Sequence, residues 1–232
     1  MIEFHGHGLL LDIEGTTSSV RFVYDVMFPL VLDRLDGFLE RRGGDADVVA
    51  ACERIAADAG STETSTSWVA AEVRRLMDGD VKATGLKQLQ GLIWKDSFES
   101  GELEAHVYDD VPAALEHWQQ LGRDLRVYSS GSIQAQRLFF GHTIHGDLLP
   151  HFTGHYDTTI GGKKEPDSYR AILADWGLPG EQVLFASDVT AELDAAREAG
   201  MQTVLLRRPG NAEPPAGHGH PEASSLDEIQ LG

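Results

Sequence analysis

The sequence is poor in cysteine and in basic residues. Cys52 is the only cysteine, so an intrachain disulfide is excluded and we expect a reducing compartment, the cytoplasm. Lysine and arginine together number 19, against 37 aspartates and glutamates, which gives a formal net charge of -18. This surplus opposes binding to a polyanion, so we expect no nucleic-acid partner. A small phosphorylated metabolite stays compatible, because a metal ion and a few local cations can reverse the field inside a pocket.

Long apolar runs are also missing near the N-terminus. The stretch Gly8–Leu11 is apolar over only four residues before Asp12 interrupts it, and no basic segment precedes it. A membrane-spanning helix needs about 20 apolar residues, and a signal peptide begins with a basic region. We therefore expect neither feature and no membrane partner. No basic stripe or coiled coil points to a macromolecular partner, which favours a monomer.

The middle of the chain has a helical character. The 232 residues could form one α/β domain with an insertion or two small domains, and we favour the first. From about Tyr24 to Gly101, apolar residues recur at helical spacing without a comparable strand signal. We therefore predict an all-helical insertion over residues 19–104, between core segments 1–18 and 105–232.

Strand and helix alternate in the rest of the chain. The continuously apolar run Gly8–Ile13 is typical of a buried strand in a parallel sheet. Further strands are expected at 124–129, 182–187 and 203–206, with helices between them, one of them capped by Asp110. This alternation predicts an α/β fold, a doubly wound parallel sheet in a three-layer core. We expect the tail rich in Gly and Pro, residues 209–225, to be irregular.

Carboxylates follow two of the predicted strands, at the edge where ligands of such sheets bind. Strand alternation would place Asp12 and Glu14 on one face, where two carboxylates can divide the roles of nucleophile and acid/base. Gly15 permits a sharp turn that could expose backbone amides to an anion. Attack of a carboxylate on phosphorus requires charge neutralisation, which Mg²⁺ supplies. Asp188, at the end of another strand, is a further oxygen ligand for such a cation.

Phosphate-binding groups lie at the other predicted strand and loop ends. Lys163 could hold a phosphate oxygen as a point charge. The Ser129 or Ser130 hydroxyl and the Gly131 amide could donate to the remaining oxygens. The set predicts a phosphatase that forms an aspartyl-phosphate.

The order of these groups resembles that of a known superfamily, the haloacid dehalogenase-like hydrolases. Within it, five strings in order are together similar to the enolase-phosphatases of methionine salvage. They are Asp12-Ile13-Glu14-Gly15-Thr16-Thr17, Lys87-Gln88-Leu89-Gln90-Gly91, Tyr128-Ser129-Ser130-Gly131-Ser132, Phe140-Gly141-His142 and Arg208-Pro209-Gly210-Asn211. The resemblance runs from about Leu9 to Asn211 and implies that the helical insertion is a cap.

The resemblance also implies an activity and a cofactor. The substrate would be 2,3-diketo-5-methylthiopentyl 1-phosphate, enolised and then dephosphorylated to the acireductone 1,2-dihydroxy-3-keto-5-methylthiopentene, with one Mg²⁺ per subunit. Asp12 would be nucleophile and Mg²⁺ ligand, Asp188 a Mg²⁺ ligand, and residue 14 would ligate the metal through its backbone carbonyl. The resemblance assigns substrate and phosphate binding to Ser129, Ser130 and Lys163.

Glu14 departs from the superfamily, which usually has Asp at this position. The longer side chain leaves open whether Glu14 serves hydrolysis, enolisation or both. It is our leading candidate for the enolisation base, and a cap residue is the rival.

Structural roles compete with each functional assignment. Asp12 or Asp188 could cap a helix, and Lys163 beside Lys164 could be a solvated pair. Glu192 could face solvent or support the site. Histidines flanked by glycine near the termini are expected to be flexible and exposed, without function: His5, His7, His218 and His220.

Other functions fit part of the pattern. A capped phosphatase for another small phosphate ester would use the same residues, whereas a dehalogenase would not need Asp188. A phospho-accepting signalling module would not carry a helical insertion directly after its first strand. A binding protein without activity would not need the complete set of polar groups.

Overall fold

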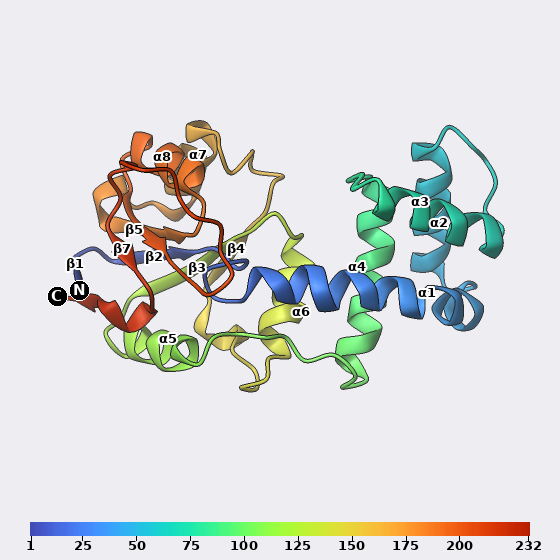
Figure 1. Cartoon of the computed structure of the whole chain (residues 1–232), viewed down its shortest axis with the longest axis horizontal. Helices are drawn as coiled ribbons and strands as arrows, with labels where there is room; N and C mark the ends of the chain where they lie inside the picture. Colours follow the sequence, from blue (N-terminus) through green and yellow to red (C-terminus); the bar gives the residue numbers. More distant parts are fainter. The chain divides into compact units, whose positions relative to one another are not determined.

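The computed structural model describes all residues 1–232 and divides the chain into two compact units. One unit consists of residues 1–23 and 104–232, and the other of residues 24–103. Figure 1 shows a sheet with flanking helices in the first unit and only helices in the second. None of the helices has the length and apolar character needed to cross a membrane.

The first unit is built on a six-stranded parallel sheet with the strand order β4-β3-β2-β5-β6-β7. The strands are β2 (Gly8–Leu11), β3 (Asp124–Tyr128), β4 (Gly154–Tyr156), β5 (Val183–Ser187), β6 (Gln202–Leu206) and β7 (Glu222–Ala223). Every residue of the neighbouring strands β2 and β5 is buried. Helices cover both faces of a parallel sheet, which explains why these central strands are continuously apolar.

Four helices form the outer layers of this unit. They are α5 (Asp110–Gln120), α6 (Ile133–Gly141), α7 (Pro166–Trp176) and α8 (Thr190–Glu198). In Figure 1, α7 and α8 lie on one side of the sheet, and α5 and α6 on the other. The α/β class predicted from the alternation of strands and helices, with a parallel sheet in three layers, is confirmed.

Two local predictions about element ends are wrong. The first strand ends at Leu11, because the chain turns at Ile13, whose carbonyl accepts from three following amides. Asp110 does not cap α5. It is the first residue of that helix, and its carboxylate binds Arg208 instead.

The tail is more ordered than predicted. It contains β7, and it is followed by a 3₁₀ turn at Leu226–Glu228 (η4) and by β8 (Ile229–Leu231). Strand β8 pairs in parallel with β1 (Ile2–Phe4), which joins the two ends of the chain. His220 in this tail is buried and bonds Thr203, so the expectation that it is exposed is wrong.

Short helical segments connect the larger elements. A π-helix, η1 (Phe22–Met27), precedes the helical unit, and the 3₁₀ turns η2 (Leu149–His151) and η3 (Gly180–Gln182) precede β4 and β5.

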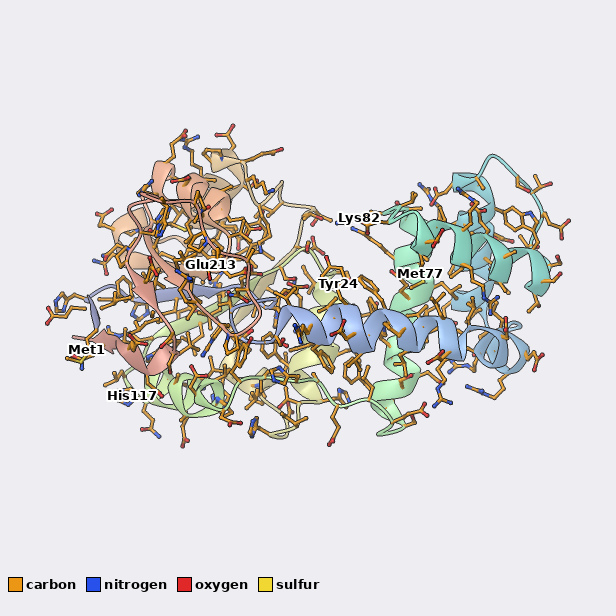
Figure 2. All side chains as sticks on the ribbon, in the orientation of Figure 1. Met1, Tyr24, Met77, Lys82, His117 and Glu213 are labelled. Carbon is orange, nitrogen blue, oxygen red and sulfur yellow. The ribbon has the colours of Figure 1, made fainter.

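The second unit contains four helices around its own apolar core. They are α1 (Phe28–Arg42), α2 (Ala46–Asp58), α3 (Thr66–Asp78) and α4 (Thr84–Glu99). Val31, Leu35, Ile55, Val73 and Leu89 are fully buried there. Side chains such as Tyr24 and Lys82 lie on the surface of this unit (Figure 2).

Helices α2 and α4 approach closely at a glycine. A Cβ atom at Gly85 would lie 2.5 Å from the backbone nitrogen of Ile55, so no larger residue fits without a backbone shift.

Candidate active site

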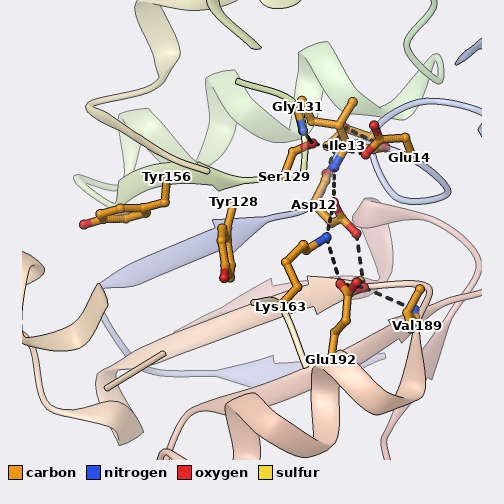
Figure 3. Close-up of polar contacts among 12 residues, drawn as sticks. Asp12, Ile13, Glu14, Tyr128, Ser129, Gly131, Tyr156, Lys163, Val189 and Glu192 are labelled. Atoms are coloured by element: carbon orange, nitrogen blue, oxygen red, sulfur yellow. Dashed lines mark hydrogen bonds and ion pairs between the residues drawn. The ribbon is translucent and has the colours of Figure 1, made fainter. Parts of the chain in front are cut away.

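The ends of three strands bring the predicted polar residues together. Asp12 directly follows β2, Ser129 follows β3, and Ser187 ends β5. Because β3, β2 and β5 are parallel neighbours, their carboxyl ends lie at one edge. The loop between β4 and α7 adds Lys163 to the same edge, as Figure 3 shows.

Lys163 links two buried carboxylates. Its Nζ atom lies 2.7 Å from Asp12 Oδ1 and 2.8 Å from Glu192 Oε2 (Figure 3). Ser187 Oγ lies 3.2 Å from Asp12 Oδ2 and 3.1 Å from Glu192 Oε2, and it accepts a hydrogen bond from the Val189 amide. The single proton of the serine hydroxyl is donated to one carboxylate at a time. These contacts close a ring through Asp12, Lys163, Glu192 and Ser187.

The ring keeps Lys163 charged. Burial alone would lower the pKa of its ammonium, but Asp12, Glu192 and Glu14 raise that pKa well above the ordinary value of 10.5. The structural alternative of a solvated lysine pair applies only to Lys164, which is exposed.

Glu14 lies beside the ring and is oriented by Ser129. The Ser129 hydroxyl donates to Glu14 Oε2 over 3.2 Å and accepts from the Gly131 amide over 3.1 Å. Burial, and then the charge of Asp12, raise the pKa of Glu14 above 4.5. A raised pKa favours the protonated form of a carboxyl group, which a general acid must be able to adopt. Ser130 is exposed, so it is Ser129 that contacts the carboxyl group.

Asp188 packs against the turn that follows Asp12. Gly15 has a φ angle of +72°, and a Cβ atom on it would lie 2.2 Å from Asp188 Oδ2, so only glycine fits here. Burial and the charge of Asp12 raise the pKa of Asp188 to about 7. Asp188 does not cap α8, because no side-chain bond caps that helix. Gly15 makes the expected sharp turn, but the amides of Gly15, Thr16 and Thr17 donate to carbonyls within the turn, so these three are not free to bind an anion.

The loop that carries Lys163 is fixed by three buried hydroxyl groups. Tyr128 donates to the Gly161 carbonyl over 2.9 Å, Ser168 to the Gly162 carbonyl over 2.8 Å and Tyr169 to the Lys163 carbonyl over 2.7 Å. Consecutive carbonyls are therefore held from the core side, which orients the lysine.

The donor chemistry of the site fits a hard divalent cation. Asp12, Glu14, Asp188 and Glu192 face the single ammonium of Lys163, so the fully ionised site would carry a large excess of negative charge. Oxygen donors in such surroundings are the ligands that Mg²⁺ prefers. No three acidic, histidine or cysteine side chains are grouped as a complete metal site, so backbone or substrate oxygens would have to complete the coordination.

Two members of the site were not among the catalytic or ligand residues predicted from the sequence. Glu192 lies on α8, four residues after Asp188, and that spacing was the available signal for it. Ser187 ends an apolar strand and gave no signal beyond its position.

Comparison with known proteins places this chain in a family. Residues 8–200 match the haloacid dehalogenase-like hydrolases. The chain is 46% identical over 222 residues to the enolase-phosphatase E1 of Methylococcus capsulatus, covering 96% of each chain. It is 48% identical over 208 residues to the enolase-phosphatase E1 of Thioalkalivibrio sulfidiphilus, covering 88% of this chain and 91% of the relative.

Solved structures share the fold of this chain. The UTR4 protein of Saccharomyces cerevisiae superposes with a TM-score of 0.83 at 32% identity, covering 95% of this chain and 98% of that one. The putative HAD-hydrolase YfnB of Bacillus subtilis, solved bound to magnesium, shares the fold with a TM-score of 0.58 at 17% identity, over 97% of this chain and 96% of its own. The chain therefore belongs to the enolase-phosphatase E1 family of the haloacid dehalogenase-like hydrolases.

Proposed function

We propose that this chain is a Mg²⁺-dependent enolase-phosphatase of methionine salvage. It converts 2,3-diketo-5-methylthiopentyl 1-phosphate to the acireductone 1,2-dihydroxy-3-keto-5-methylthiopentene by enolisation followed by dephosphorylation. Identity of 41% to 48% to enolase-phosphatases E1 over nearly the whole chain supports this activity. The observation that carries the chemistry is the contact of Lys163 Nζ with Asp12 Oδ1 at 2.7 Å, inside a buried group of carboxyls.

Asp12 is the nucleophile in this proposal. Its Oδ1 atom lies 2.7 Å from Lys163 Nζ, so the attacking carboxyl group lies beside the cation that is proposed to bind the phosphate. A carboxylate oxygen forms a bond to phosphorus while the ester P–O bond breaks, and the leaving oxygen takes a proton from Glu14. Water then attacks the aspartyl-phosphate, Glu14 accepts the proton of that water, and phosphate leaves Asp12 free. Lys163 stabilises charge on the transferring oxygens.

One Mg²⁺ per subunit fits the same residues. The proposed ligands are the carboxylates of Asp12 and Asp188 and the backbone carbonyl of Glu14. When bound, the ion supplies charge neutralisation for phosphoryl transfer and polarisation of a carbonyl for enolisation.

The Ser129 hydroxyl has two roles in this scheme. It orients Glu14 over 3.2 Å, and together with Ser130, Gly131 and Lys163 it binds the phosphate-bearing end of the substrate. Glu14 is the proposed enolisation base, because its raised pKa lets it hold the abstracted proton.

The remaining assignments are also proposals. Residues 19–104 act as the cap domain, with residues 1–18 and 105–232 as the catalytic core, and the enzyme is a cytoplasmic monomer whose partner is a small phosphorylated metabolite. Replacing the helical segment by a short linker is expected to change substrate preference. An unchanged preference would contradict its role as a cap.

The decisive experiment follows enol absorbance and phosphate release together, with purified protein and the diketone phosphate. We expect enol to appear before phosphate in Mg²⁺ and both to disappear in EDTA. Phosphate release from generic esters without enolisation would reduce the protein to a phosphatase for another ester. No Mg²⁺-dependent hydrolysis of any ester would refute the mechanism.

A further inference from the structure

The Gly15–Thr16 turn follows the proposed nucleophile, and its carbonyls accept hydrogen bonds from a segment nearly two hundred residues later in the sequence. Asn211 Nδ2 donates to the Gly15 carbonyl over 2.8 Å and to the Leu206 carbonyl over 3.1 Å. Arg208 Nε donates to the Thr16 carbonyl over 3.0 Å. Consecutive carbonyls of the turn are therefore bound by side chains that do not contact Asp12 or Lys163.

Arg208 is itself rigidly held. Its two terminal nitrogens donate to the two carboxylate oxygens of Asp110 over 3.0 and 2.8 Å, and the guanidinium lies 4.4 Å from the centre of the Tyr108 ring. It also donates to the Ser224 carbonyl over 3.0 Å. Arg208 is only 6% exposed. A guanidinium group that binds both oxygens of one carboxylate and also stacks on an aromatic ring has little freedom to move.

Asp110 completes this support. Its carboxylate also accepts from the Ser225 hydroxyl over 3.0 Å and from the Leu226 amide over 2.6 Å. Burial alone would raise the pKa of Asp110, but the hydrogen bond from Arg208 and the Leu226 amide lower it below 3.8, so the pair stays charged. The C-terminal segment, α5 and the turn are therefore tied together at one buried ion pair.

The Gly15–Thr16 turn lies between two of the proposed metal ligands, Glu14 and Asp188. It carries Glu14 on one side, and Gly15 packs so closely on Asp188 that a Cβ atom would lie 2.2 Å from Asp188 Oδ2. A displacement of the Gly15 and Thr16 carbonyls would therefore move Glu14 relative to Asp188. Thr16 is fully buried, so water cannot easily replace a lost donor.

We propose that Arg208 and Asn211 are positioning residues, which fix the Gly15–Thr16 turn so that Glu14 and Asp188 keep the separation needed to bind Mg²⁺ and to react. This inference rests on the proposed function. It assigns a role to the two outer residues of the string Arg208-Pro209-Gly210-Asn211, whose side chains bond to the turn and to Asp110. Supporting residues around a metal site change its affinity or its activity by about 10–100-fold when they are replaced.

The test compares Asn211→Ala and Arg208→Lys with the control Arg207→Lys in the full chain. Arg208→Lys keeps a positive charge opposite Asp110. Its single ammonium cannot bind both carboxylate oxygens of Asp110 and the Thr16 carbonyl at the same time. Arg207 is the sequence neighbour, and its guanidinium bonds only to Glu213 and Glu222 on the surface. Each variant is measured for Mg²⁺ binding by calorimetry without substrate, for kcat and KM, and for Tm.

We expect Asn211→Ala and Arg208→Lys to weaken Mg²⁺ binding about tenfold and to lower kcat at saturating Mg²⁺ about 10–100-fold, with a smaller change in KM. Arg207→Lys should match the wild type. A purely structural role would lower Tm while leaving the Mg²⁺ affinity of the folded variant unchanged, and that result would overturn the proposal.

The two variants remove different contacts of the same turn. If one of them fails to fold, the Mg²⁺ affinity of the other still tests the proposal. Should neither fold, amide exchange in the wild type decides. A turn fixed by Arg208 and Asn211 should protect its Thr16 and Thr17 amides before Mg²⁺ is added, so fast exchange of these amides in the metal-free wild type would overturn the proposal. Absence of Mg²⁺-dependent hydrolysis in the wild type would refute the proposed function, whereas wild-type activity with unaffected variants would refute only the positioning role.

Discussion

At the scale of single residues, the site is defined by one cation among several carboxyls. Lys163 contacts Asp12 and Glu192 directly, and its charge opposes the rise that burial causes in the pKa of Glu192. The neighbouring Lys164 has the same chemistry but lies in solvent. Burial therefore decides which of two adjacent lysines can act on phosphate.

The two lysines provide a matched pair of variants. Lys163→Gln removes the charge and leaves a shorter polar side chain, so kcat should fall about 10²–10³-fold, the range seen when one group that stabilises a transition state is lost. Lys164→Gln should retain the kcat of the wild type. Phosphate release at saturating Mg²⁺ measures both variants. Equal loss in the two, or no loss in Lys163→Gln, would contradict the assigned role of Lys163.

The raised pKa of Asp188, about 7, predicts a pH-dependent Mg²⁺ affinity. The metal-free folded protein binds this proton more tightly than the unfolded chain, so the proton stabilises the fold as pH falls from about 7 towards 4. Mg²⁺ must displace it, and the apparent dissociation constant should therefore be about tenfold higher at pH 6 than at pH 8. Raised pKa values of Glu14 and Glu192 act in the same direction.

The difference in Tm with and without Mg²⁺, measured across this pH range, checks this prediction. Burial lowers the pKa of His155 to about 4, so this histidine stays neutral in the folded protein over the whole range and does not obscure the effect of Mg²⁺. An effect of Mg²⁺ that stays constant from pH 6 to pH 8 would show that Asp188 is not displaced from its proton by the ion.

At the scale of elements, the loop before α7 shows how an irregular segment becomes a precise one. Three hydroxyls from the core bind its consecutive carbonyls, and Tyr169, which is fully buried, binds the carbonyl of Lys163 itself. The position of the Lys163 side chain thus depends on the Tyr169 hydroxyl, a group that takes no part in the proposed reaction.

Tyr169→Phe isolates that hydroxyl. The variant leaves the Lys163 carbonyl without this donor, which costs about 1–3 kcal/mol. Tm should therefore fall by several degrees, given about 2–4 °C for each kcal/mol in a chain of this size. We also expect kcat to fall about tenfold. Tyr24→Phe, at a position 61% exposed, is the control, and a Tyr169→Phe enzyme with unchanged kcat would mean that the loop orients Lys163 without this bond.

The sequence allowed prediction of those elements that have a local signature. Continuous apolar runs revealed β2 and β5, and helical spacing with Pro166 at the first turn gave the bounds of α7. The pairing of β1 with β8 could not be predicted, because each strand is three residues long and its partner lies at the other end of the chain. Asp110 was mistaken for a helix cap for the same reason, since its partner, Arg208, is distant in sequence.

Site residues were predictable to the extent that they follow strands. Asp12, Ser129 and Asp188 each occur where an apolar run stops, and a parallel sheet brings such points together. The contacts among them depend on long-range packing, and no local pattern indicates that Ser129 turns to Glu14 or that Ser187 bridges two carboxyls.

At the scale of the whole molecule, the net charge of -18 opposes the capture of an anionic substrate. The positive charges that can attract the substrate are Lys163 and a bound cation in the site. Their attraction acts over a shorter distance than the repulsion from the whole acidic protein. Raising the ionic strength from about 0.03 to 0.15 M shortens the screening length from roughly 18 Å to about 8 Å. The long-range repulsion is then screened more strongly than the contacts inside the site.

We therefore expect kcat/KM for the phosphorylated substrate, at fixed saturating Mg²⁺, to rise about twofold over this range of ionic strength, while kcat stays constant. Initial rates at low substrate concentration, with KCl as the added salt, measure the first quantity, and rates at saturating substrate measure the second. A fall in kcat/KM with salt would mean that the local cations, rather than the acidic surface, govern capture. A change in kcat would mean that salt acts on the catalytic step and not on the encounter.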